Sequence, residues 1–140
     1  MIRELSRQIF AGRPIWMTGL MVFCAYMTFI YMPFDLFYKP VAEDAEVWLG
    51  ITLYGWAAKS TEPLHWAIYG AGSYGFFKMK HWMHPWAAIY VAQVAIAMFV
   101  WPILNDRGNL GSGLIAGTMF MLLGIALFNA KDEWHPPRAS

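Results

Sequence analysis

The feature that most constrains this chain is a short basic segment between two uncharged apolar runs. This segment, residues 76–85, which we call the hinge, reads Phe-Phe-Lys-Met-Lys-His-Trp-Met-His-Pro. Neither run carries an Asp, Glu, Lys or Arg: the first extends from Pro63 to Phe77 and the second from Trp86 to Leu104. A helix of about 19 residues rises roughly 28 Å, close to the hydrocarbon thickness of a bilayer. The hinge is too short to cross a membrane, so it predicts a turn between two antiparallel membrane helices.

Composition supports the same class of protein. The chain has 140 residues, of which 59% are hydrophobic and 14% charged, whereas an average soluble domain is about 25% charged. We therefore expect a single membrane domain over residues 1–140. The net charge of +1 points to neither nucleic acid nor an acidic partner. The one cysteine, Cys24, cannot form a disulfide within the chain.

Four membrane helices are predicted, over residues 14–34, 62–80, 85–104 and 110–130. Pro14 suits the first turn of the first helix, and Pro33 is expected to end or kink it, leaving Asp35 at the far interface. The apolar stretch 46–58 is too short to span a bilayer, and we expect it to form a helix that lies at the interface or dips into the membrane. The predicted fold class is all-α: an integral membrane four-helix bundle with an additional short interfacial or re-entrant helix between helices one and two.

The distribution of basic residues predicts the orientation. With four spans, both termini share one side with the hinge, and that side holds seven basic residues against three on the other. The seven are Arg3, Arg7, Arg13, Lys78, Lys80, Lys131 and Arg138, and the three are Lys39, Lys59 and Arg107. Because cytoplasmic loops carry the excess of Lys and Arg, both termini are expected in the cytoplasm, with the chain in the inner or plasma membrane if it is bacterial.

Small residues one helical turn apart predict where helices approach closely. The helix-packing candidates are Ala71 and Gly75 in the second span, Ala88 and Ala92 in the third, and Gly113 and Gly117 in the fourth. They could pack within the bundle or against a partner chain. Residues 70–75 also match the letters GxGxxG, but that nucleotide-binding motif needs a preceding strand. We interpret them as a packing face and expect no nucleotide.

Two histidines of the hinge, His81 and His84, could place their imidazoles on one face of a helix. Zinc would need a third and a fourth ligand, and only His65, His135 or a carboxylate remain. The preferred interpretation is a pair of interfacial histidines in an aromatic belt. We expect neither a metal nor a cofactor.

Candidate ligand-binding residues lie mainly at the outer edge. Away from the ends of the predicted spans no carboxylate or basic side chain occurs, and Gln93 is the notable polar group there. Asp35, Glu62 and His65, together with Trp56, would gather at the outer mouth of the bundle, where a carboxylate and an imidazole could do acid–base work. The alternative is solvation at the level of the headgroups and an acid favoured at a helix N-terminus.

The order of these parts resembles the emopamil-binding (EXPERA-domain) family. The matching residues are Asp35, the segment Trp56-Ala-Ala-Lys59 followed by Glu62-Pro-Leu, Tyr74-Gly-Phe-Phe-Lys78, and the region from Trp82 to Tyr90. The family also places a carboxylate inside helix two, where this sequence has Gly, Ala and Ser. The resemblance implies four membrane helices with both ends cytoplasmic, and proteins that bind or isomerise sterols or bind cationic amphiphiles.

Two functions are consistent with these observations. The preferred hypothesis is a non-catalytic subunit or scaffold that packs against partner helices, with membrane lipids and other membrane chains or a second copy as its partners. The alternative is a binder, or an isomerase, of sterol-like or other lipid-like amphiphiles, with Asp35 and Glu62 at the pocket mouth and His65 as a further catalytic candidate.

Overall fold

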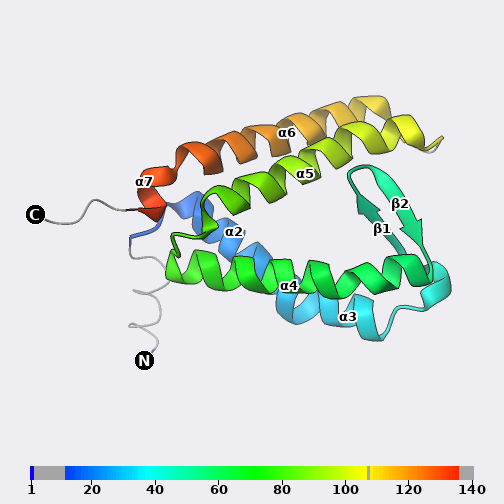
Figure 1. Cartoon of the computed structure of the whole chain (residues 1–140), viewed down its shortest axis with the longest axis horizontal. Coiled ribbons are helices and arrows are strands. Elements are labelled where there is room, and N and C mark those ends of the chain that lie inside the picture. The colour runs from blue at the N-terminus through cyan, green and yellow to red at the C-terminus, as the bar shows by residue number, and fades with distance from the viewer. Residues whose placement is uncertain (2–11, 107, 136–140) are drawn as a thin grey trace, which may run out of the picture.

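The structure, a computed structural model, describes residue 1, residues 12–106 and residues 108–135. In chain order its elements are α2 (Ile15–Tyr26), the π-helix η1 (Met27–Tyr31), α3 (Met32–Phe37), the 3₁₀ turn η2 (Val41–Glu43), β1 (Ala45–Trp48), β2 (Ile51–Tyr54), α4 (Trp56–Lys78), α5 (Met83–Leu104), α6 (Leu110–Asn129) and α7 (Lys131–Trp134). Figure 1 shows the chain passing four times along its long axis, first through α2 to α3 and then through α4, α5 and α6. The hinge and α7 lie at one end, and the hairpin β1–β2 lies towards the other.

Three of the described helical segments are long and apolar enough to cross a membrane. They are Ile15–Phe37, Met83–Leu104 and Leu110–Asn129. The predicted span 62–80 corresponds to α4, which has 23 residues but does not reach the same hydropathy. The described helices are therefore consistent with the predicted membrane class, whereas the four-span bundle stays a prediction.

The first helical segment continues beyond the expected boundary at residue 34. The π-helix η1 precedes α3, and Pro33 occupies the first turn of α3, where a proline needs no backbone N–H partner. As a result Pro33 does not end the segment, and Asp35 lies within α3 rather than beyond the helix.

The predicted helix over residues 46–58 is wrong, and the fold, although mostly helical as predicted, contains a small two-stranded sheet. This stretch forms an antiparallel hairpin in which Trp48 pairs with Ile51, followed by the start of α4 at Trp56. The two turn residues, Leu49 and Gly50, have φ of 52° and 89°, the left-handed region used by tight hairpin turns. Gly50 is also required by space, because a Cβ there would lie 2.5 Å from Val100 Cβ. The β-branched and aromatic residues of the run favour strands once this turn is formed.

The long helices pack as two pairs, α2 with α4 and α5 with α6. At the second interface a Cβ on Gly113 would lie 2.8 Å from the Met98 carbonyl oxygen, and one on Gly117 would lie 2.6 Å from the Phe99 ring. Further along, a Cβ on Gly124 would lie 3.6 Å from the Ala88 carbonyl oxygen and 3.7 Å from the Ala92 backbone nitrogen. The GxxxG face of α6 is therefore used inside the chain.

The two predicted packing residues of α4, Ala71 and Gly75, differ in burial. Gly75 is buried against the hinge, because a Cβ there would lie 2.2 Å from Met83 Sδ. Gly72 packs against α2 instead, because a Cβ there would lie 3.1 Å from Cys24 Sγ, so the two glycines serve helix packing within α4. Ala71, in contrast, is exposed.

At the hinge end the two pairs meet in an apolar core. Its buried members come from α2, α4, α5, α6 and α7, and they are Met17, Met21, Phe76, Met83, Ala88, Leu127 and Trp134. Arg13 lies beside this core and is 7% exposed. Its guanidinium donates to the carbonyl of Phe76, and to that of Phe77 at 3.1 Å, so it caps the C-terminal end of α4 from the start of α2.

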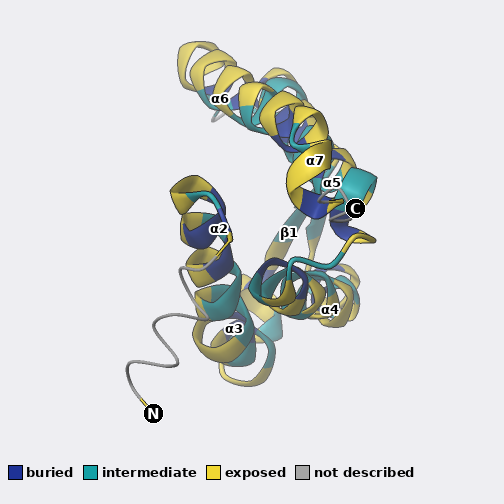
Figure 2. Cartoon of the chain, turned by 90° about the vertical axis from the view of Figure 1, so that its left-hand side faces the viewer, coloured by how far each residue is buried: buried dark blue, intermediate teal, exposed yellow. Residues whose placement is uncertain are grey.

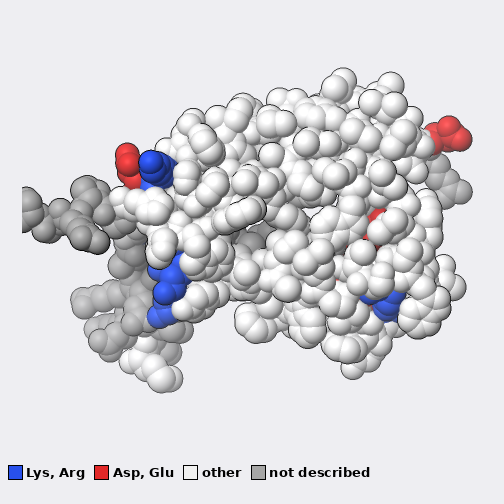
Figure 3. Space-filling model, viewed as in Figure 1, with Lys and Arg blue, Asp and Glu red and all other residues white. Residues whose placement is uncertain are grey.

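Away from the hinge end, the two pairs are separated by the hairpin, which contacts both α4 and α5. Figure 2 shows β1 between the α5–α6 pair and the helices α2, α3 and α4, with exposed residues on the outward surfaces. In Figure 3 the charged residues of the visible face gather near the two ends, and the broad middle shows none. This pattern is that of a chain whose middle faces hydrocarbon.

Candidate functional site

Charged side chains converge where the base of the hairpin meets α3 and α4. We call them the charged cluster; its members are Asp35, Lys39, Asp44, Glu46, Lys59, Glu62 and His65. Three of its acids are almost completely covered, since Asp35 is 3% exposed, Asp44 1% and Glu62 0%. Buried charges of this kind persist only where they are paired.

Two lysines pair these acids. The Lys39 ammonium lies 3.0 Å from Asp35 Oδ1 and 3.1 Å from Asp44 Oδ1. The Lys59 ammonium lies 3.3 Å from Asp44 Oδ2 and 3.4 Å from Glu62 Oε2. Lys59 also donates to the backbone carbonyls of Asp35 and Lys39, at 2.5 and 3.1 Å. Asp44, at the start of the hairpin, is thereby fastened to α4 and to the segment that follows α3.

A second contact fastens β1 to α4. Glu46 Oε2 lies 2.7 Å from His65 Nδ1, and the indole of Trp48 stacks on the same imidazole with ring centroids 4.0 Å apart and planes 12° apart. Because Glu46 and Trp48 are two residues apart on one strand, their side chains share a face of the hairpin. Both hold the hairpin against α4.

Crowding of the acids changes their protonation. Burial raises the pKa of Glu62, and the neighbouring Asp44 and Asp35 add to the effect, so that the pKa is about 7. Burial alone would raise the pKa of Asp44 as well, but Glu62 and the two lysine ammonium groups hold it below its ordinary value. The pKa values of the two carboxyl groups therefore differ widely, with Asp44 ionised and Glu62 close to its titration point at neutral pH.

The same acids could in principle bind a cation. One ligand oxygen from each of Asp35, Glu46 and Glu62 lies within 4.8 Å of the others, and Asp35 and Glu62 are buried. Oxygen ligands at this spacing suit a hard cation such as Ca²⁺. However, the Lys59 ammonium already lies against Glu62, and His65 against Glu46. The cluster therefore contains its own counter-charges.

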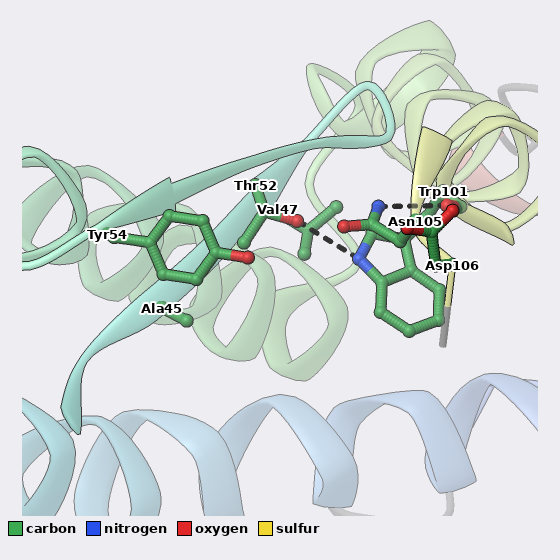
Figure 4. A pocket seen from close by; sticks show the side chains of 7 residues that line it. All are labelled: Ala45, Val47, Thr52, Tyr54, Trp101, Asn105 and Asp106. Carbon is green, nitrogen blue, oxygen red and sulfur yellow. Dashed lines mark hydrogen bonds between the residues drawn. The ribbon is translucent and has the colours of Figure 1, made fainter. Parts of the chain in front are cut away.

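Two hollows lie near the charged cluster without being lined by its residues. The first, of about 560 Å³, lies between the hairpin and the end of α5 and is lined by Ala45, Val47, Thr52, Tyr54, Trp101, Asn105 and Asp106. Figure 4 shows the Trp101 indole reaching across to Thr52, to whose hydroxyl its Nε1–H donates at 3.0 Å. This bond ties β2 to α5.

The second hollow is an apolar groove of about 340 Å³ along the seam between η1 and α4. It is lined by Thr28, Phe29, Pro63, Trp66, Ala67 and Gly70. Trp66 Nε1–H donates to the Thr28 carbonyl at 2.7 Å, a carbonyl that belongs to the π-helical segment. Pro63 places one end of the groove next to Glu62, although the Glu62 side chain is buried beneath.

The structure brings together some of the predicted ligand-binding residues. Asp35, Glu62 and His65 all belong to the charged cluster. Trp56 does not, because it is 76% exposed at the first turn of α4. Gln93 is half-buried in the middle of α5, and among the described residues no hydrogen bond joins it to the cluster.

Sequence analysis missed the roles of Lys39, Asp44, Glu46 and Lys59. Spacing carried part of the signal, since Asp35 and Lys39 are four residues apart and Lys59 and Glu62 three apart, as in ion pairs on one helix face. The other part depends on the hairpin, which was predicted as a helix. Asp35 and Glu62, predicted at the mouth of a pocket, are buried in the charged cluster.

Comparison with known proteins adds no assignment at this point. No protein-family model matches the chain, and no curated protein or solved structure matches it.

Proposed function

We propose that this chain is a non-catalytic membrane subunit or scaffold, which packs against a helix of a partner chain through the exposed face of α4. The observation that carries the proposal is an uncovered stripe of residues along α4 beside the apolar groove. Its members recur every three or four residues, and they are Ser60, Pro63, Ala67, Ala71, Tyr74 and Lys78.

The chemistry of this stripe supports a protein partner more than lipid. Ala67 and Ala71 are small residues one turn apart, which let a second helix approach closely, and the groove beside them can accept a side chain of that helix. The segments Ile15–Phe37, α5 and α6 are apolar enough to face lipid by themselves, but α4 is not. A helix of this composition is stabilised at membrane depth by protein contacts.

The charged cluster supports a non-catalytic role. Its acids are buried, and its two lysines and one histidine each lie within ion-pair distance of an acid. These contacts hold the hairpin between α4 and α5, and neither of the two hollows described above is lined by a cluster residue. The cluster thus acts as a fastening of the fold.

The orientation follows from charge. Among the described residues the hinge end carries Arg13, Lys78, Lys80 and Lys131, whereas the other end carries most of the acids. By the positive-inside rule the hinge and both termini face the cytoplasm, and the membrane is the inner or plasma membrane if the protein is bacterial. Arg3, Arg7, Arg107 and Arg138, which also entered the sequence-based prediction, lie outside the described residues.

The alternative is a binder, or an isomerase, of a sterol-like or other lipid-like amphiphile, and one observation favours it. The groove along Trp66 is lined in part by Thr28 and Phe29 of the apolar segment Ile15–Phe37, and its Pro63 end adjoins the charged cluster. A flat apolar body could lie in the groove with a polar head towards Lys39, the least covered cation of the cluster. This arrangement is also what the resemblance to the EXPERA-domain family would imply.

One experiment separates these proposals. The full chain is extracted in mild detergent, and everything that co-purifies, protein and lipid, is identified by mass spectrometry. We expect a stoichiometric second chain that is lost in Ala71→Leu, because leucine blocks close approach, and retained in Ala126→Leu. Ala126 is an exposed alanine on α6 and serves as the matched control.

Other outcomes would contradict the scaffold. A chain that purifies alone and unchanged by Ala71→Leu has no partner on this face. A stoichiometric sterol or amphiphile that is lost when Ala67 or Gly70 is replaced by leucine would instead support the binder.

A further inference from the structure

We propose that His81, His84 and His135 form a binding site for a divalent transition-metal ion of the zinc class. The three imidazoles lie near one another at the hinge end, whereas the charged cluster lies towards the opposite end of the molecule. The ring centroids of His81 and His135 are 5.9 Å apart, and those of His84 and His135 are 6.2 Å apart. In the sequence His135 was one of several candidates for a third ligand, and the fold brings it beside the hinge from the end of α7.

The backbone holds each of these residues in place. His84 N–H donates to the His81 carbonyl at 3.2 Å, which closes a turn and keeps the two hinge histidines together. His135 follows α7 directly, and its N–H donates to the Lys131 carbonyl at 3.0 Å. Its neighbour Trp134 is 2% exposed and packs against Phe76 with ring centroids 5.4 Å apart, which anchors the segment that carries His135.

A hydrogen bond prepares His84 as a ligand. His84 Nε2 lies 3.0 Å from the Phe128 carbonyl oxygen, and because a carbonyl can only accept, Nε2 must carry the proton. In the neutral ring Nδ1 then has a free lone pair. Metal-binding histidines commonly donate their second ring N–H to a backbone carbonyl in this way, which fixes the tautomer and the ring orientation.

The spacing is within reach of a shared ion. With Zn–N distances of about 2.0–2.1 Å, two imidazoles on one tetrahedral zinc have centroids about 5 Å apart. The observed pairs need to close by about 1 Å, which side-chain rotation can supply because His81 and His135 are exposed. Three imidazoles leave the fourth position to water or to another ligand, and imidazole is a ligand suited to zinc, copper and nickel.

Such an ion would connect the two helix pairs. His81 and His84 belong to the hinge between α4 and α5, and His135 belongs to the tail that follows α6 and α7. Binding would therefore fix the tail against the hinge and stabilise the folded chain by a free energy that rises with the logarithm of the free metal concentration once this exceeds the dissociation constant. This inference does not depend on the partner surface of α4.

Metal titration of the full chain tests the site. The protein is purified in mild detergent with an affinity tag that contains no histidine, treated with EDTA and titrated with Co²⁺, whose visible absorption reports tetrahedral nitrogen ligation; Zn²⁺ is then added as a competitor. We expect one ion per chain. His81→Gln and His135→Gln should each weaken binding by at least about tenfold, the loss seen when even an outer-sphere partner of a metal ligand is removed.

His65→Gln is the matched control, since the fourth histidine lies in the charged cluster beside Glu46. It should bind Co²⁺ as the original chain does. A Zn²⁺-dependent rise in melting temperature, present in the original chain and lost in His135→Gln, is the second readout. Absence of saturable binding would overturn the proposal. So would binding that survives both hinge and tail substitutions, or that falls equally in His65→Gln.

Discussion

The two ends of this molecule are closed by opposite kinds of contact. At the hinge end, apolar side chains such as Met17, Phe76 and Leu127 pack into a core that excludes water. At the hairpin end, Asp44, Lys59 and their neighbours close the structure with ion pairs. Both ends are well buried, so the difference lies in what holds them.

This difference affects how each end responds to change. An apolar core depends on volume, and a neighbour can shift partly into a space that a smaller residue leaves. A buried ion-pair network depends on every member, because removal of one leaves the remaining charges uncompensated. The hairpin end should therefore be more sensitive to single substitutions, and sensitive to pH, whereas the apolar core of the hinge end should respond to the size of its side chains.

The largest effect is expected from Asp44→Asn. Asp44 pairs with both lysines and its side chain is fully covered, so its loss leaves two ammonium groups with less compensation in a buried site. Breaking a buried pair in this way costs about 3–5 kcal/mol. The free energy of unfolding in detergent micelles, followed by circular dichroism during titration with SDS, measures it.

Glu43→Gln is the matched control. Glu43 is the neighbouring acid but is exposed, and surface substitutions usually change stability by less than about 0.5 kcal/mol. Equal losses in Asp44→Asn and Glu43→Gln would mean that the ion pairs contribute little to stability.

A smaller effect is expected from Leu127→Ala at the hinge end. Leu127 is 1% exposed in the apolar core, and shortening it should cost about 2–4 kcal/mol through the cavity that it leaves. The loss should be the same at every pH, because no charged group is involved. Leu122→Ala, at a residue of the same helix that is 61% exposed, should be close to neutral. A loss at Leu127 that varied with pH would remove the distinction between the two ends.

The contrast also explains which parts of the fold the sequence could predict. The apolar runs that became α5 and α6, and the turn of the hinge, follow from composition and charge over long windows. The sequence left open whether Gly113 and Gly117 pack within the chain or against a partner chain. The close approach of α6 to Met98 and Phe99 shows that they pack within the chain.

The hairpin and the charged cluster were harder to predict for a physical reason. The apolar run around Trp48 and Leu53 is too short for its periodicity to distinguish a helix from strands. The decisive feature is Gly50, whose position against Val100 is a tertiary contact. Once the hairpin is misread, Asp44 and Glu46 cannot be placed beside Lys59 and His65.

The smallest and sharpest test concerns the pH dependence of the hairpin end. Glu62 has a pKa of about 7 in the folded chain, against the ordinary value of 4.5. Between these two pH values the folded state keeps the proton that the unfolded state has lost. The free energy of unfolding therefore falls as pH rises from about 4.5 to about 7 and then levels off.

Glu62→Gln should remove this slope, since the amide does not titrate. We expect a difference on the order of 1–3 kcal/mol between pH 5 and pH 8 in the original chain and a much flatter profile in the variant. The hinge end supplies the internal reference, because Leu127→Ala should shift the whole profile without changing its slope. A profile that rises over this pH range, or a slope that persists in Glu62→Gln, would show that Glu62 does not hold its proton in the folded chain, and the hairpin end would then be closed by fixed charges alone.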